Sequence, residues 1–138
     1  MKTIFLDSSV LFSAVSSPTG GSSKLFTIKN IQLQTSRLVL TETERNVRKK
    51  LRSYHLERFF MLVDKLTILD QPPKRTIIKK AKKVIIEKDV VILAETKQAK
   101  TDFLVTLDKK HFLTTSVAKF LKPQKALTPK MLIEMVEK

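Results

Sequence analysis

Short apolar runs with the character of buried strands alternate along this chain with longer segments whose apolar residues recur at helical spacing. The strand-like runs are residues 3–6, 31–35, 66–69 and 103–106. Because strands that alternate with helices form a sheet with helices packed on its faces, this pattern predicts an α/β fold. The 138 residues are typical of one domain, so we expect a single domain over residues 1–138.

The segments between the strands predict helices, two of them with recognisable starts. Ser36 is a suitable N-cap for a helix whose buried stripe consists of Val39, Leu40, Thr43, Val47 and Leu51. Thr128 as N-cap and Pro129 as first residue predict a final helix that ends at Val136. Further helices are expected over residues 23–28, 55–66 and 74–84 and from Asp89 onward. Residues 16–23 contain both glycines of the chain and predict a long, flexible loop, a mobile lip.

The chain is strongly basic. Lys and Arg total 27 against 13 Asp and Glu, which gives a formal net charge of +14 and a pI of about 10.2. Lysine-rich surfaces also occur for solubility or in heat-stable proteins, but in the latter Glu rises together with Lys, and here it does not. The charge therefore favours a polyphosphate partner such as a nucleic acid.

The absence of cysteine excludes disulfides and thiolate metal ligands, so oxygen ligands would hold any metal ion. The apolar start of the chain is interrupted by Asp7, and no long apolar run follows it. We therefore expect neither a signal peptide nor a membrane span, and we expect a cytoplasmic protein.

Four of the scarce acidic residues stand at the ends of strand-like runs or near the starts of helices. Asp7 and Asp108 each follow a strand-like run, Asp89 opens a helix, and Glu42 lies one turn into another helix. Each position also has an ordinary explanation, since Asp is a good N-cap and a carboxylate is favoured in the first turn of a helix. The carboxyl ends of parallel strands, however, meet at one edge of a sheet, where ligands bind, so Asp7 and Asp108 are expected to face one crevice.

Converging carboxylates repel one another unless a cation offsets their charge, and Mg²⁺ or Mn²⁺ prefers such oxygen ligands. Glu44 is an alternative to Glu42 as the acid of the helix, but it lies at helical spacing from Arg48 and can pair with it. Glu42 borders the buried stripe at Thr43 and points toward the sheet. Asp102 is either a turn residue before a strand or an acid that supports the site.

Four segments of the sequence, taken together, have a familiar pattern, and they are FLDSSVLFSA, SRLVLTETERNVRKKL, KDVVILAETKQAKTDFLVTLDKKHF and LTPKML. In these segments the chain resembles the PIN domain family, small metal-dependent nucleases that include the VapC-like toxins of many toxin–antitoxin pairs. The resemblance covers nearly the whole chain, and the segment from KDVVILAET to TLDKKHF is its most specific part.

This resemblance implies a Rossmann-like three-layer α/β/α sandwich with a mostly parallel central sheet. It also implies an acidic quartet that binds Mg²⁺ or Mn²⁺ and cleaves RNA, and the quartet falls on Asp7, Glu42, Asp89 and Asp108. The family's small polar residue falls on Ser8 or Ser9, and Thr106 matches the Thr before the last acid. Asp102 is shared by a subset of the family, and Glu95 adds a charge where many members have a small residue. An antitoxin protein and a second copy of the chain are the protein partners that the resemblance implies.

The site hypothesis is metal-assisted hydrolysis of an RNA phosphodiester. Asp7, Asp89 and Asp108 would hold one or two ions, Glu42 would ligate an ion or orient the attacking water, and Ser9 and Thr106 would support the ligands. Arg45 and Lys49 lie one turn apart near Glu42 and are expected to contact the RNA backbone. The later lysine run predicts a solvated helix face, and we interpret His111 as structural.

Three alternatives were weighed against this hypothesis. A PIN-like module that binds RNA or protein without cutting it would be expected to lack one of the acids, and all four are present. A response-regulator receiver needs a central phospho-acceptor, but the residue in that place, Asp70, is followed by Gln71, Pro72 and Pro73. A nucleotide-binding Rossmann enzyme needs a glycine fingerprint that two glycines cannot form. Housekeeping RNA processing remains an alternative role for the same nuclease.

Overall fold

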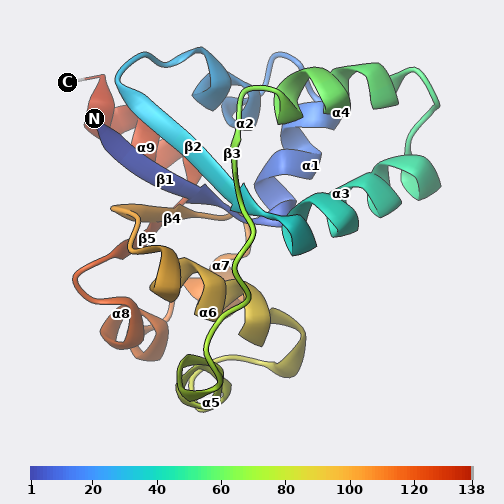
Figure 1. Cartoon of the computed structure of the whole chain (residues 1–138). Coiled ribbons are helices and arrows are strands. Elements are labelled where there is room, and N and C mark those ends of the chain that lie inside the picture. The colour runs from blue at the N-terminus through green and yellow to red at the C-terminus, as the bar shows by residue number, and fades with distance from the viewer. Residues whose placement is uncertain (138) are drawn as a thin grey trace.

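The computed structural model describes residues 1–137, which form a five-stranded sheet flanked by helices (Figure 1). The strands are β1 (Lys2–Leu6), β2 (Ile31–Ser36), β3 (Thr67–Leu69), β4 (Phe103–Val105) and β5 (Lys125–Leu127). The helices are α1 (Ser8–Ser16), α2 (Gly21–Lys24), α3 (Arg37–Lys50), α4 (His55–Val63), α5 (Arg75–Lys82), α6 (Val90–Ala99), α7 (Lys109–Phe112), α8 (Thr115–Leu121) and α9 (Pro129–Val136), with 3₁₀ turns η1 (Leu25–Thr27) and η2 (Glu87–Asp89). No helix within the described range is long and apolar enough to cross a membrane.

The strands are arranged in the order β3-β2-β1-β4-β5, and every pairing is parallel. The chain runs outward from β1 to β2 and β3, and then crosses back to β4 on the other side of β1. The order therefore reverses between β1 and β4, and such a switch point is where α/β proteins place their ligands, at the carboxyl ends of the strands. The predicted three-layer α/β/α fold with a parallel sheet is confirmed.

The alternating side chains of β1 divide the core into two layers. Phe5 points to one face, where α1, α3, α4, α5, α6 and α8 contribute to a large buried cluster. Ile4 and Leu6 point to the other face, where they meet Leu25 of η1 and Leu132 of α9. These side chains are 0% exposed, and their burial on both faces explains why the strand is almost uniformly apolar.

The predicted starts of two helices are confirmed. The Ser36 hydroxyl accepts a hydrogen bond from the Val39 N–H (3.2 Å) and caps α3, and the Thr128 hydroxyl accepts one from the Met131 N–H (3.2 Å) and caps α9. In α3, Val39, Thr43 and Val47 form the buried stripe.

The long, flexible loop predicted over residues 16–23 is confirmed only for residues 17–20, which form a short turn, and its predicted length is wrong. α1 continues to Ser16, α2 begins at Gly21, and Ser22 and Ser23 are buried. The Ser23 hydroxyl donates to the Ala14 carbonyl (2.9 Å) and accepts from the Arg58 guanidinium of α4 (2.9 Å). These bonds hold the segment against α1 and α4, so it forms no lip.

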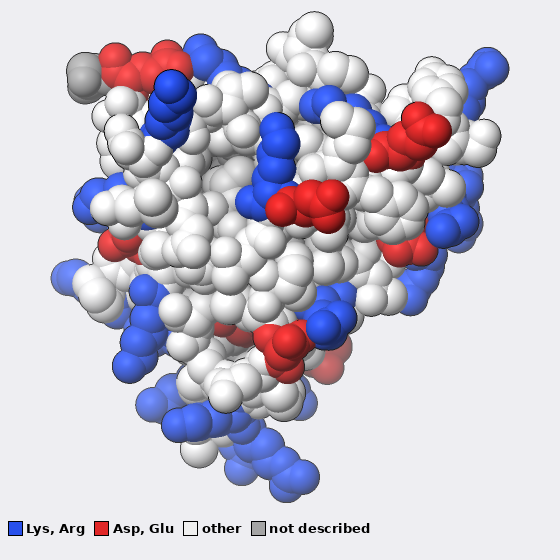
Figure 2. Space-filling model, turned by 45° about the horizontal axis from the view of Figure 1, so that its top comes forward, with Lys and Arg blue, Asp and Glu red and all other residues white. Residues whose placement is uncertain are grey.

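Lys and Arg side chains outnumber Asp and Glu on the face in Figure 2 and gather at its lower end, over α5. The acidic side chains of the predicted quartet lie elsewhere, at the carboxyl edge of the sheet.

Candidate metal centre at the carboxyl edge of the sheet

The register of the two central strands brings Asp7 and Asp108 together. Leu6, the last residue of β1, pairs with Val105, the last residue of β4, and the Asp7 N–H donates to the Val105 carbonyl (3.1 Å). Asp108 follows three residues after Val105 and caps α7. The two carboxylates therefore come from the two strands on either side of the switch point.

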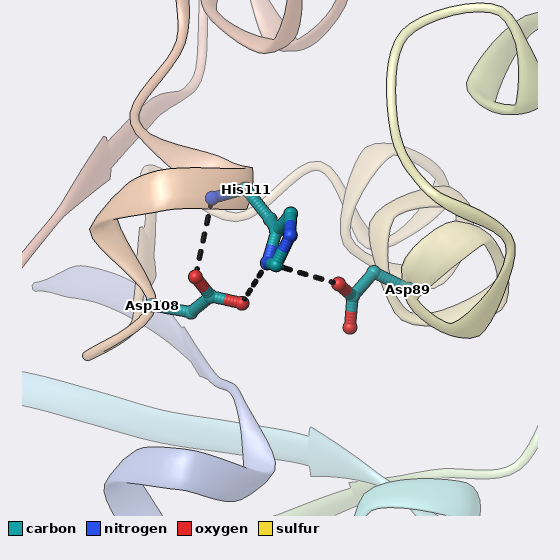
Figure 3. A group of neighbouring side chains, drawn as sticks. All are labelled: Asp89, Asp108 and His111. Atoms are coloured by element: carbon teal, nitrogen blue, oxygen red, sulfur yellow. Dashed lines mark hydrogen bonds and ion pairs between the residues drawn. The ribbon is translucent and has the colours of Figure 1, made fainter.

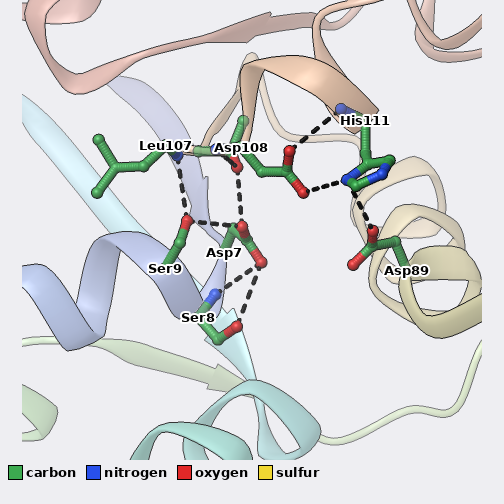
Figure 4. Close-up of polar contacts among 8 residues, drawn as sticks. Asp7, Ser8, Ser9, Asp89, Leu107, Asp108 and His111 are labelled. Carbon is green, nitrogen blue, oxygen red and sulfur yellow. Dashed lines mark hydrogen bonds and ion pairs between the residues drawn. The ribbon is translucent and has the colours of Figure 1, made fainter.

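The Asp7 carboxylate is fixed by three neighbouring groups (Figure 4). Its Oδ1 accepts from the Ser8 N–H (2.8 Å), and its Oδ2 accepts from the hydroxyls of Ser9 and Thr106 (2.8 Å each). Thr106 Oγ1 also accepts from the Asp108 N–H (3.0 Å), so one hydroxyl joins Asp7 to the turn that holds Asp108. Because Asp7 is only 4% exposed, these bonds fix both its position and its orientation.

Asp89, Asp108 and His111 form a compact group in which one ligand atom from each lies within 4.8 Å of the others. The His111 ring lies between the two carboxylates, with Nδ1 at 2.8 Å from Asp108 Oδ2 and 4.0 Å from Asp89 Oδ2 (Figure 3). The backbone also contributes, because the His111 N–H donates to Asp108 Oδ1 (3.1 Å). The turn that opens α7 thus positions both Asp108 and His111.

Asp89 occupies the N-cap position of α6, yet its side chain makes no capping hydrogen bond. The residue is 9% exposed, and its Oδ2 is a buried oxygen without a hydrogen-bond partner among residues 1–137. An unsatisfied buried carboxylate oxygen is costly, and native proteins accept it where the group has another role. The ordinary explanation of Asp89 as a helix cap therefore does not account for its carboxylate.

Burial and mutual repulsion raise the pKa values of two members of the quartet. For Glu42, burial raises the pKa most, and the charges of Asp7 and Asp89 raise it further. Burial likewise raises the pKa of Asp89, aided by Asp7 and Asp108 and opposed by Lys88 and His111. Glu42 and Asp89 are therefore each close enough to other acids of the quartet to be affected by their charge.

Asp108 differs from these two acids. Burial would raise its pKa, but the hydrogen bonds from the His111 ring and backbone outweigh burial and lower the pKa of Asp108. The anionic form is therefore favoured at Asp108 and disfavoured at its neighbour Asp89.

The structure distinguishes Glu42 from its alternative Glu44. The Glu44 carboxylate accepts from the Arg48 guanidinium one turn along α3 (3.0 Å). Glu42 is half-buried and interacts electrostatically with Asp7 and Asp89. Glu42 is therefore the acid that α3 directs toward the group.

The remaining predicted residues differ in their relation to the site. Arg45 and Lys49 are exposed on α3, and of these two only Arg45 interacts with the acids, because its charge lowers the pKa of Glu42. Asp102 precedes β4 and lies at the opposite, amino edge of the sheet. Its carboxylate accepts from the Thr3 N–H (2.8 Å) at the start of β1. Asp102 therefore connects two strand starts and cannot support the ligands, which corrects the sequence prediction.

His111 and Glu95 belong to the neighbourhood of the site more closely than sequence reasoning indicated. His111 was interpreted as structural, but its position three residues after the cap Asp108 turns its ring back toward Asp108. Glu95 of α6 accepts from the Ser36 hydroxyl (2.7 Å), and burial, opposed by that bond and aided by Glu42, raises the pKa of Glu95. Asp89 and Glu95 are six positions apart, a spacing that does not place two side chains on one face of a helix, so periodicity gave no signal for Glu95.

The residues present fit a hard divalent cation. The donor set consists of carboxylate oxygens, and His111 can add an imidazole nitrogen in the tautomer that does not donate this nitrogen's hydrogen to Asp108. The buried Asp89 Oδ2 has no hydrogen-bond partner among residues 1–137.

No protein-family model matches the sequence, and no curated protein matches it either. Solved structures do match the fold. One is VapBC2 from Rickettsia felis, solved bound to a DNA fragment from its promoter, with a TM-score of 0.68 and 16% identity over 91% of this chain and 98% of that chain. Another is PAE2754 from Pyrobaculum aerophilum, with a TM-score of 0.69 and 15% identity over 99% of this chain and 96% of that chain.

The chain therefore shares the α/β/α fold of these two solved structures over nearly its whole length. The resemblance that the sequence motifs indicate is therefore supported by the fold over nearly the whole chain.

Proposed function

We propose that this protein is a divalent-metal-dependent endoribonuclease that hydrolyses RNA phosphodiester bonds. The observation that carries the proposal is the buried Asp89 Oδ2, which lacks a partner among residues 1–137 although it lies beside Asp108 and His111. A cluster of carboxylates is unexpected in a chain of net charge +14 unless it serves a cation. The surrounding positive charge suits a polyanionic substrate.

In this proposal Asp7, Asp89 and Asp108 would hold Mg²⁺ or Mn²⁺, and the hydroxyls of Ser9 and Thr106 keep the Asp7 carboxylate in the fixed orientation that a ligand needs. When bound, the ion lowers the pKa of a water molecule and offsets the charge that develops on the phosphate. The raised pKa of Glu42 suits it to orient the attacking water and to accept a proton from it. Arg45 and Lys49, exposed on the same helix, would contact the RNA backbone beside the scissile bond.

The biological role we propose is that of a cytoplasmic toxin controlled by an antitoxin protein. The likeness to a chain of VapBC2, a two-component assembly bound to its own promoter DNA, supports this role. Tyr54, Phe60 and Met61 are exposed around α4, at 64, 48 and 63%. Such apolar groups favour a protein partner, either the antitoxin or a second copy of the chain.

The test of the nuclease is cleavage of a mixed pool of structured and single-stranded RNA by the purified protein with Mg²⁺, with Mn²⁺ or with EDTA. We expect cleavage with either ion and none with EDTA, because the carboxylates alone cannot offset the charge of the phosphate. Cleavage of equal rate in EDTA would contradict the proposal. Salt-sensitive RNA binding without cleavage under any condition would favour the non-cleaving module instead.

His111 should tune the choice of metal ion. Imidazole nitrogen is a better ligand for transition ions than for Mg²⁺, which prefers oxygen and keeps its waters. We expect His111→Asn to weaken Mn²⁺ binding by about tenfold while Mg²⁺ binding changes less, as measured by calorimetric titration. His55→Asn alters the other histidine of the chain and is the control. If the affinities for Mn²⁺ and Mg²⁺ fell equally, His111 would have only a structural role.

A further inference from the structure

A hollow rich in lysine lies at the far end of α6 from the metal centre. It has a volume of about 390 Å³ and is formed by α5, the C-terminal end of α6 and α8. Its lining includes Lys74, Lys80, Lys97 and Lys100, with Ile77 and Phe120 as its apolar part. We call it the lysine hollow.

The positive charge of the lysine hollow is not neutralised by acids. No Asp or Glu lines it, and within residues 1–137 none of its four lysines forms an ion pair. Lys97 is held in place because its Nζ donates to the carbonyl of Lys122 at 3.0 Å, while Lys80 and Lys100 are exposed. Figure 2 shows the basic side chains over α5 as the densest group on that face. Four cations around one hollow form a site for an anion.

The apolar part of the hollow provides a second kind of contact. The Phe120 ring is partly exposed and lies 5.9 Å from Lys97 Nζ, measured to the ring centroid. An aromatic ring next to ammonium groups is the combination that binds single-stranded nucleic acid, since bases stack on the ring and phosphates contact the cations.

The lysine hollow and the candidate metal centre lie at opposite ends of α6. A second hollow, whose lining includes Ser36, Asp70 and Glu95, shares Gln71 and Gln98 with the lysine hollow. Gln98 accepts from the Lys74 N–H (2.8 Å) and donates to the Pro72 carbonyl (3.0 Å), which fixes this shared wall. From Asp89 to Lys100 the helical rise is about 16 Å, a distance that a few nucleotides span.

We propose that the lysine hollow binds the phosphates of the RNA strand a few nucleotides away from the bond that is cut. Lys80 and Lys100 contact the phosphates, and Phe120 stacks on a base. The substrate class rests on the proposed nuclease function, whereas the binding site rests on the hollow itself. Lys82 and Lys83 of the same basic segment do not line the hollow and remain a solvated face, as the sequence predicts.

The test is a measurement of RNA binding in EDTA, in which no metal-dependent cleavage takes place. A fluorescein-labelled single-stranded RNA of about 12 nucleotides is titrated with wild type and with the Lys80→Gln, Lys100→Gln double variant, and anisotropy is followed over a salt series. The matched control is Lys82→Gln, Lys83→Gln, which removes the same charge from the surface next to the hollow. We expect the first pair to weaken binding roughly tenfold and to reduce the log–log salt slope by about 1.4, and the control to change affinity less than about twofold.

Equal effects of the two pairs would overturn the proposal, because the lysines would then act only through their general positive charge. An effect of the first pair on duplex DNA but not on RNA would also overturn it. The outcome for the nuclease is separate. If Lys80→Gln, Lys100→Gln weakens RNA binding but the wild type cleaves no RNA in Mn²⁺, the binding site is supported and the nuclease proposal is contradicted. If the wild type cleaves RNA but this variant binds RNA as well as wild type does, the nuclease proposal is supported and the binding site is contradicted.

Discussion

Replacement of Asp7 by Asn is expected to reduce metal-dependent RNA cleavage by more than about a hundredfold, since even the groups that support metal ligands contribute about 10- to 100-fold. Asn removes the negative charge at the centre of the quartet but keeps the shape of the side chain. Its oxygen can still accept from the Ser8 N–H, and the hydroxyls of Ser9 and Thr106 can rotate to accept from its amide. We therefore expect an unchanged melting temperature or a slightly higher one.

The matched control for this substitution is Asp70→Asn. Asp70 follows β3 at the same edge of the sheet, but it is exposed and forms an ion pair with Arg37 instead of facing the other acids. Initial cleavage rates of the three proteins, each purified by the same steps, should be equal for wild type and Asp70→Asn. Retained activity in Asp7→Asn, or equal loss in both variants, would contradict the assigned role of Asp7.

The elements that the sequence predicts are those with strong local signals. β4 and the last three residues of β1 are short apolar runs, and they are buried because the two strands lie in the interior of a parallel sheet. The caps Ser36 and Thr128 combine a side-chain acceptor with an apolar stripe in the helix that follows. Asp7 and Asp108 could be paired from sequence for the same reason, because each directly follows a central strand.

The parts that sequence reasoning missed depend on contacts between distant segments. β5 is an edge strand of only three residues, and a strand of this length is too short to show an alternating pattern. The role of Asp102 is decided by Thr3, ninety-nine positions away, which no local pattern reveals. The segment 16–23 has a loop-like composition, yet its last three residues begin α2, where Arg58 of α4 donates to the Ser23 hydroxyl. His111 gains its role from the turn that Asp108 caps, and the short α7 gives no periodicity of its own.

The Asp89→Asn variant is expected to be more stable than wild type when no metal is present. Burial raises the pKa of Asp89, so the folded protein binds this proton more tightly than the unfolded chain does. The stability that this group contributes is therefore present below its ordinary pKa and is lost as the pH rises through the raised value. Asn stays neutral throughout, so we expect a gain of about 1 kcal/mol at pH 7, or roughly 3 °C in melting temperature, which disappears toward pH 4.

Metal ions should reverse this order of stability. An ion at a concentration of 100 times its Kd stabilises the folded wild type by about 2.7 kcal/mol. A variant that lacks one of the metal-binding carboxylates is stabilised much less. Asp108→Asn is the variant to compare with Asp89→Asn, in thermal melts with and without Mn²⁺. The His111 bonds lower the pKa of Asp108, so its charge stabilises the fold above its ordinary pKa and this contribution is lost as the pH falls through the lowered value. Both variants should lose the response to Mn²⁺, but only Asp89→Asn should be more stable than wild type in EDTA. If Asp89→Asn proved less stable in EDTA, the buried carboxylate would be a structural group and not a metal ligand.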